Sequence, residues 1–92
     1  MPTFALLTKL SPEATRDPKA FAELNRAVTE RIRRQCPEVR WLSNYFILGP
    51  YDYLDIYEAP SEEVATQVSS IVRTFGHGTP ETWTLISWDR FK

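Results

Sequence analysis

The stretch from Tyr45 to Tyr57 constrains the fold more than any other part of the chain. It consists of two apolar and aromatic runs separated by Gly49-Pro50-Tyr51-Asp52. Aromatic and β-branched residues favour strands, whereas proline presets its own φ and cannot donate to a ladder. The stretch therefore predicts a β-hairpin with a four-residue connection.

Two helices are indicated by capping residues followed by apolar residues at spacings of three and four. Asp17 is a good N-cap with Pro18 just inside the helix, and the apolar stripe that follows ends before Cys36. Ser61 precedes two acidic residues and a second stripe, which ends before Gly76. The spacing predicts that both stripes face a common core.

The remaining apolar runs predict four strands. They cover residues 3–10, 39–48, 53–59 and 81–89. The order of elements is then β-α-β-β-α-β, which predicts an α+β, ferredoxin-like fold with a four-stranded antiparallel sheet and two helices on one face. We expect residues 1–92 to form a single domain.

Both faces of the predicted sheet are apolar, although a sheet with helices on one side usually turns polar residues to water. We assign the more aliphatic set, Phe4, Leu6, Leu54 and Ile56, to the helix side. The open face then carries an aromatic set: Trp41, Tyr45, Tyr53, Tyr57, Trp83 and Trp88. Because a contiguous exposed apolar patch marks an association surface, we expect a homodimer in which two sheets close face to face.

Composition and charge exclude several classes of function. Eleven Lys and Arg against twelve Asp and Glu give a net charge of −1, so we expect no nucleic-acid partner. No apolar run approaches the roughly 20 residues of a membrane span, and the amino terminus has no secretion signal, so we expect a cytoplasmic protein without membrane contact. A single Cys36 and a single His77 supply no spaced ligand set, and no phosphate loop occurs, so neither a metal nor a cofactor is expected.

Four residues are candidates for chemistry: Tyr51, Asp52, Asp55 and His77. A phenol and a carboxylate on one turn can orient a ligand or move a proton, but both can equally stabilise the hairpin. Asp55 lies mid-strand on the predicted open face, where burial would raise its pKa, and an interface hydrogen bond is the alternative to catalysis. Histidine changes its charge near neutral pH, so His77 is a candidate general base, whereas its two flanking glycines indicate a helix-ending loop.

The chain resembles the GYD domain family through the turn at Gly49 to Asp52 and the residues on either side of it, Phe46-Ile47-Leu48 and Glu58-Ala59-Pro60. The first strand and turn, Leu6 to Glu13, also look like those of the family, so the resemblance covers nearly the whole chain. It implies a dimeric α/β-barrel built from paired ferredoxin-like sheets. Similar barrels include cofactor-independent monooxygenases, haem-degrading enzymes, lactone isomerases and ligand-sensing domains, and the fold does not choose among them.

We therefore expect a small homodimer that binds a small apolar or aromatic molecule. Its ligand-binding residues are predicted to be Tyr45, Tyr53, Tyr57 and Trp83. The first alternative is a cofactor-independent monooxygenase or isomerase that uses the four candidates named above. The second is a non-enzymatic assembly module whose aromatic face only forms the dimer.

Overall fold

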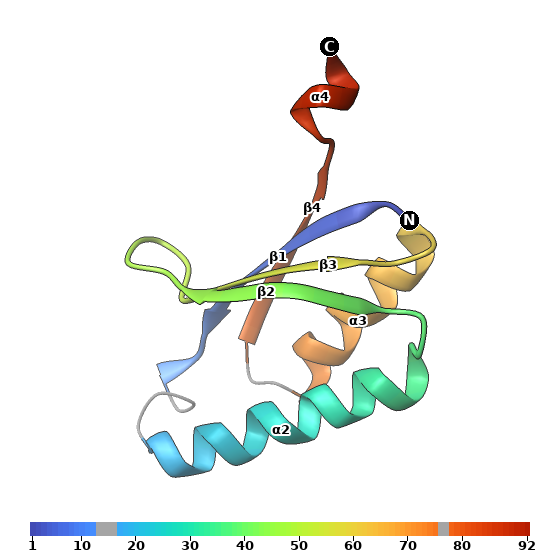
Figure 1. The fold of residues 1–92 in the computed structure, drawn as a ribbon. Helices are drawn as coiled ribbons and strands as arrows, with labels where there is room; N and C mark the ends of the chain where they lie inside the picture. Colours follow the sequence, from blue (N-terminus) through green and yellow to red (C-terminus); the bar gives the residue numbers. More distant parts are fainter. Residues whose placement is uncertain (13–16, 76–77) are drawn as a thin grey trace.

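The computed structural model describes residues 1–12, 17–75 and 78–92 (Figure 1). Within these ranges the chain forms β1 (Thr3–Leu10), α2 (Pro18–Gln35), β2 (Arg40–Phe46), β3 (Tyr53–Glu58), α3 (Glu62–Phe75), β4 (Gly78–Leu85) and α4 (Trp88–Phe91). The strands pair in an antiparallel sheet of order β2-β3-β1-β4. Both long helices, α2 and α3, lie on one face of the sheet (Figure 1). The predicted α+β, ferredoxin-like arrangement is confirmed, with a sheet that is open within one copy of the chain.

The long helices begin at the predicted caps. The Asp17 carboxylate accepts hydrogen bonds from two backbone N–H groups of the first turn, at 3.1 and 3.4 Å, and Pro18 is the first helical residue. Ser61 Oγ accepts from the backbone N–H of Val64 at 3.3 Å. Each cap satisfies donors that have no partner inside the helix, so local sequence places both starts.

The core lies between these helices and the sheet. Its buried members come from β1, α2, β3 and α3 and the turns that follow them: Phe4, Leu6, Val28, Ile32, Cys36, Tyr57, Ala59, Ala65, Val68, Ile71 and Val72. Burial raises the pKa of the Cys36 thiol, as expected for a packed side chain. In the described part of the chain, no helix combines the length and the apolar character needed to cross a membrane.

The prediction for the faces of the third strand is wrong. Phe4 of β1 lies opposite Tyr57, and Leu6 lies opposite Asp55. Directly opposed residues share a face, so the Tyr and Asp side chains of β3 turn toward the helices and its Leu and Ile side chains turn away. Leu54 is therefore on the open face. Each face of β3 carries large aliphatic or aromatic side chains, so either face could pack against the helices. Only the pairing with β1 decides which one does.

The prediction for the second strand is wrong in part, because a bulge interrupts its alternation. The register shifts between Trp41, which pairs with Tyr57, and Ser43, which pairs with Ile56. The extra residue, Leu42, changes the face that each later side chain reaches. Trp41 and Tyr45, which were assigned to one face, therefore belong to opposite faces, and the Trp41 ring packs on Tyr57 with centroids 5.2 Å apart.

Two predicted strand ends also move. β2 ends at Phe46, so six residues connect the hairpin instead of four, and the backbone N–H of Ile47 donates to the carbonyl of Asp52 at 2.9 Å across this loop. β4 runs from Gly78 to Leu85 and is followed by α4, so Trp88 is helical rather than part of the last strand. Ser87 at the N-cap position marks this change of structure.

Candidate functional site

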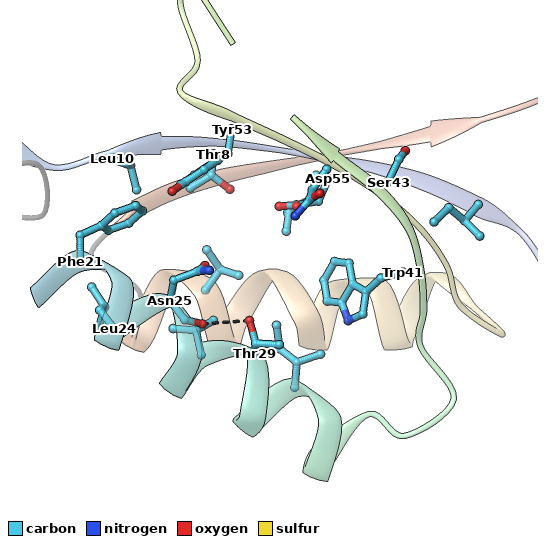
Figure 2. Close-up of a pocket in the computed structure, with 16 residues that line it drawn as sticks. Thr8, Leu10, Phe21, Leu24, Asn25, Thr29, Trp41, Ser43, Tyr53 and Asp55 are labelled. Carbon is cyan, nitrogen blue, oxygen red and sulfur yellow. Dashed lines mark hydrogen bonds between the residues drawn. The ribbon is translucent and has the colours of Figure 1, made fainter. Parts of the chain in front are cut away.

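A pocket of about 360 Å³ lies between α2 and the sheet (Figure 2). Aromatic walls are contributed by Phe21 of α2, Trp41 of β2 and Tyr53 of β3. The polar lining residues are Thr8, Asn25, Thr29, Ser43, Asn44 and Asp55. An apolar cavity with a few convergent polar groups is the usual form of a small-molecule site.

Asp55 is the charged residue among the described residues that line this pocket. Figure 2 shows it extending from β3 toward α2, from which Asn25 and Thr29 point back at the sheet. Its carboxyl group makes no hydrogen bond or ion pair with the described residues, and desolvation raises its pKa from 3.8 to about 6. The sequence placed Asp55 on the open face, which the register with Leu6 corrects.

The raised pKa of Asp55 predicts a pH-dependent stability. Between about pH 4 and pH 6 the folded protein holds a proton that the unfolded chain has lost, so this carboxyl stabilises the fold less as the pH rises through about 6. We expect Asp55→Asn to raise the free energy of unfolding by about 2 kcal/mol at pH 7.5, after allowance for partial solvent access. Urea denaturation at fixed protein concentration measures the difference.

Other carboxyl groups titrate in the same range, so the comparison is between the wild type and Asp55→Asn at each pH. The gap should close to within about 0.5 kcal/mol at pH 4, where both side chains are neutral. A gap that is equally large at pH 4 and pH 7.5 would show that burial does not penalise the ionised form.

Asp52 ties the hairpin loop to β1. Its carboxylate Oδ2 accepts from the backbone N–H of Leu10 at 2.7 Å, and its own N–H donates to the carbonyl of Thr8 at 2.9 Å. These two bonds extend the ladder beyond the regular part of β3. Asp52 therefore has the structural role that was the alternative to a chemical one.

Tyr51 crosses β1 and contacts β4. Its hydroxyl donates to Glu81 Oε2 at 2.6 Å, and Trp83 Nε1 donates to Oε1 of the same carboxylate at 2.6 Å. The rings of Tyr51 and Trp83 meet edge to face with centroids 6.4 Å apart. The hydrogen bond to Glu81 raises the pKa of the Tyr51 phenol, and the bond from Tyr51 lowers the pKa of Glu81.

The opposite side of the sheet from the helices is what we call the sheet face. It is defined by six apolar or aromatic residues that the strand register places together: Ala5, Leu7, Tyr45, Leu54, Ile56 and Trp83. Figure 1 shows neither long helix on this side. The sheet face is thus mainly aliphatic, whereas the sequence predicted an aromatic one.

The structure separates the predicted site residues. Asp55 and Tyr53 line the pocket, and both also line an adjoining hollow of about 150 Å³ together with Tyr45. Tyr57 is completely buried in the core, and Trp83 belongs to the sheet face. The fourth candidate for chemistry, His77, lies outside the described residues. Among the residues that are described, no three His, Cys, Asp or Glu side chains are grouped as metal ligands.

Sequence reasoning missed Asn25, Thr29 and Glu81. Asn25 and Thr29 follow Phe21 at intervals of four, so they lie beside the apolar stripe of α2 that faces the sheet. This spacing could have predicted that both residues line the pocket. Glu81 stands two residues before Trp83 in a strand, and this spacing puts both on one face. No pattern in the neighbouring sequence indicated that Tyr51 would contact Glu81 and Trp83.

Comparison with known proteins shows the family of the chain. Residues 4–92 match the GYD domain family. The chain is also similar to a Thermus thermophilus protein described as a glutamine synthetase and cystathionine beta-lyase binding protein. The two are 31% identical over 85 residues, which cover 92% of this chain and 86% of the relative.

Proposed function

The chain belongs to the GYD domain family, and we propose that it is a homodimeric binding protein whose partner is an enzyme such as glutamine synthetase or cystathionine beta-lyase. The similar Thermus thermophilus protein is described as a binding protein for these two enzymes. The likeness spans most of both chains, which supports the transfer of a binding role.

The observation that carries the proposal is the amount of large apolar side chain that one copy leaves exposed. The most exposed of these residues are Leu48 (105%), Phe46 (81%), Trp88 (72%), Phe91 (72%) and Ile86 (68%). Trp83 on the sheet face is 47% exposed. Large exposed apolar side chains on a domain this small support association with other proteins.

We assign the sheet face to the homodimer. A domain of this size buries only about 60–65% of the surface of its unfolded chain, so a second copy would add substantially to the core. Two sheets stacked through Tyr45, Leu54 and Ile56 would form the barrel that the family resemblance implies. The Tyr51–Glu81–Trp83 cluster, at one side of this face, would then form a polar rim.

We assign the enzyme partner to the C-terminal segment, residues 86–91. In Figure 1 this segment extends beyond the end of β4, away from α2 and α3. The rings of Trp88 and Phe91 stack with centroids 5.9 Å apart, which presents a rigid aromatic pair to solvent. Aromatic residues of this kind dominate the binding energy of protein interfaces.

The test is a titration of the purified homodimer with purified glutamine synthetase and with cystathionine beta-lyase from the same organism. We expect the wild type to bind at least one of them. The double variant Trp88→Ala/Phe91→Ala should bind at least about tenfold more weakly, since aromatic hot spots contribute 2 kcal/mol or more each. Biolayer interferometry with the immobilised enzyme measures both constants.

The matched control is Phe75→Ala, which removes a 41% exposed aromatic ring at the end of α3, away from the C-terminal segment and from the sheet face. Its affinity should equal that of the wild type. Absence of binding to both enzymes would refute the proposed partner. Equal losses in the control and the double variant would refute the assignment to the C-terminal segment.

We also propose that the pocket holds a small apolar or aromatic molecule. Its volume of about 360 Å³ and its three aromatic walls support this second role. Tyr51 and Asp52 are engaged in hairpin contacts outside the pocket, while Asp55 points into it, which supports ligand binding more than a catalytic site shared by all three.

A further inference from the structure

The pocket contains one feature that an apolar ligand would leave unexplained, the unpaired carboxyl group of Asp55. The polar residues that line the pocket with it, among them Thr8, Asn25 and Asn44, are neutral. In the described chain it has no hydrogen bond or ion pair, although it sits at the centre of β3 between strands on both sides. Burying an unpaired carboxylate costs free energy that a bound cation could offset.

The rest of the lining favours a cation with an organic body. Phe21 and Tyr53 stack with ring centroids 5.5 Å apart, and Trp41 forms another wall. Aromatic faces attract ammonium groups and also pack well on apolar groups. The described lining includes no Lys, Arg or His, so nothing in it would neutralise an anionic ligand beside the ionised Asp55.

We infer that the pocket binds a compact primary amine with an apolar, preferably aromatic, body, whose ammonium group pairs with the Asp55 carboxylate. The inference rests on the proposal that the pocket holds a small molecule, and it specifies the chemical class. The ammonium group donates three hydrogen bonds, which the carboxylate and the amide oxygens of Asn25 and Asn44 can accept. The volume is at the lower end for ligand sites, which limits the body to about one ring.

Three probes of nearly equal size test the inference: benzylamine, benzyl alcohol and benzoate. They carry a positive, a neutral and a negative head group on the same ring. At pH 7.5 we expect benzylamine to bind the wild-type homodimer at least tenfold more tightly than benzyl alcohol, and benzoate most weakly. Chemical-shift changes of the pocket residues in NMR titrations give the affinities and show that the probe occupies this site.

Asp55→Asn keeps the size of the side chain and removes its charge. In this variant the tenfold preference for benzylamine should disappear while benzyl alcohol binds as before. Thr29→Val, which removes a neutral lining hydroxyl at nearly constant volume, is the matched control and should keep the preference.

Protonation of Asp55 provides an independent readout. The elements packed around it, α2, β1, β2 and α3, contribute no titratable or charged side chain to the described lining, and β3 adds only the Tyr53 phenol. We therefore expect the preference for benzylamine to weaken at pH 5 and to be unchanged between pH 7.5 and pH 8.5.

The possible results distinguish the inference of an amine ligand from the proposal that the pocket binds a small molecule. If benzyl alcohol binds in the pocket as tightly as benzylamine, the amine class is wrong and the small-molecule pocket stands. If no probe shifts the pocket residues, even at millimolar concentration, both are wrong. A preference for benzylamine that survives in Asp55→Asn would overturn the assignment of the ammonium group to this carboxylate.

Discussion

Leu54→Glu is expected to convert the proposed homodimer into a monomer at micromolar concentration. Leu54 lies on the sheet face, opposite Leu7 in the β1–β3 register. In a symmetric dimer both copies carry the substitution, so the interface would bury two carboxylates among apolar side chains. Each buried unpaired ion costs several kcal/mol, so we expect the dissociation constant to rise by at least about 100-fold.

Sedimentation velocity over a range of concentrations measures this change, and far-UV circular dichroism checks that the monomer remains folded. Leu48→Glu is the matched control, because the same substitution is made at a fully exposed loop position away from the sheet face. It should remain a dimer. A wild type that is monomeric at micromolar concentration would refute the homodimer, and a dimeric Leu54→Glu would refute its assignment to the sheet face.

The second large effect concerns Tyr57, whose side chain is completely buried. Its ring packs between Phe4, at a centroid distance of 5.6 Å, and Trp41, at 5.2 Å. We expect Tyr57→Ala to lower the free energy of unfolding by about 3–5 kcal/mol, because it removes a large core side chain and leaves a cavity. This loss is a large share of the roughly 5–14 kcal/mol expected for a domain of this length.

Tyr57→Phe separates the ring from the hydroxyl. The Tyr57 hydroxyl is buried and has no hydrogen-bond partner among the described residues, and burial raises the pKa of the phenol to about 12. Removing an unpaired buried hydroxyl should stabilise the protein by about 1 kcal/mol. Urea denaturation at one protein concentration compares both variants with Leu48→Ala, a fully exposed loop position where the change should be within about 0.5 kcal/mol.

A loss of stability in Tyr57→Phe would contradict this account, since it would mean that the hydroxyl has a partner in the folded protein. Should Tyr57→Ala fail to fold, the phenylalanine variant still decides the role of the hydroxyl. Equal stability of Tyr57→Ala and the wild type would show that the core does not depend on this ring.

Much of the fold could be predicted from local sequence. Asp17 and Ser61 are caps whose side chains bond to backbone only two or three residues away, so the helix starts follow from a few neighbouring residues. The first strand was predicted with its observed bounds, Thr3–Leu10. The last strand was extended too far, because the apolar residues after Leu85 continue a strand-like pattern into a segment that forms α4.

The candidate site could be predicted only in outline. Asp55 and Tyr53 were named from the sequence, but Asn25 and Thr29 were not, because a polar residue beside an apolar helical stripe is usually solvated. Tyr51 was expected to act at the hairpin tip. Its contact with Glu81 spans 30 residues of sequence, and no local pattern encodes such a pairing.

By itself, the sequence determined the two long helices and the four strands, and hence their β-α-β-β-α-β order, because capping and periodicity are properties of neighbouring residues. Only the tertiary structure decided which face of β3 is buried. With apolar residues on both sides of that strand, the choice depends on its register with β1, which places Asp55 opposite Leu6. That register turns the charged residue into the pocket and leaves Leu54 on the open sheet face, and the bulge at Leu42 places Asn44 opposite Asp55.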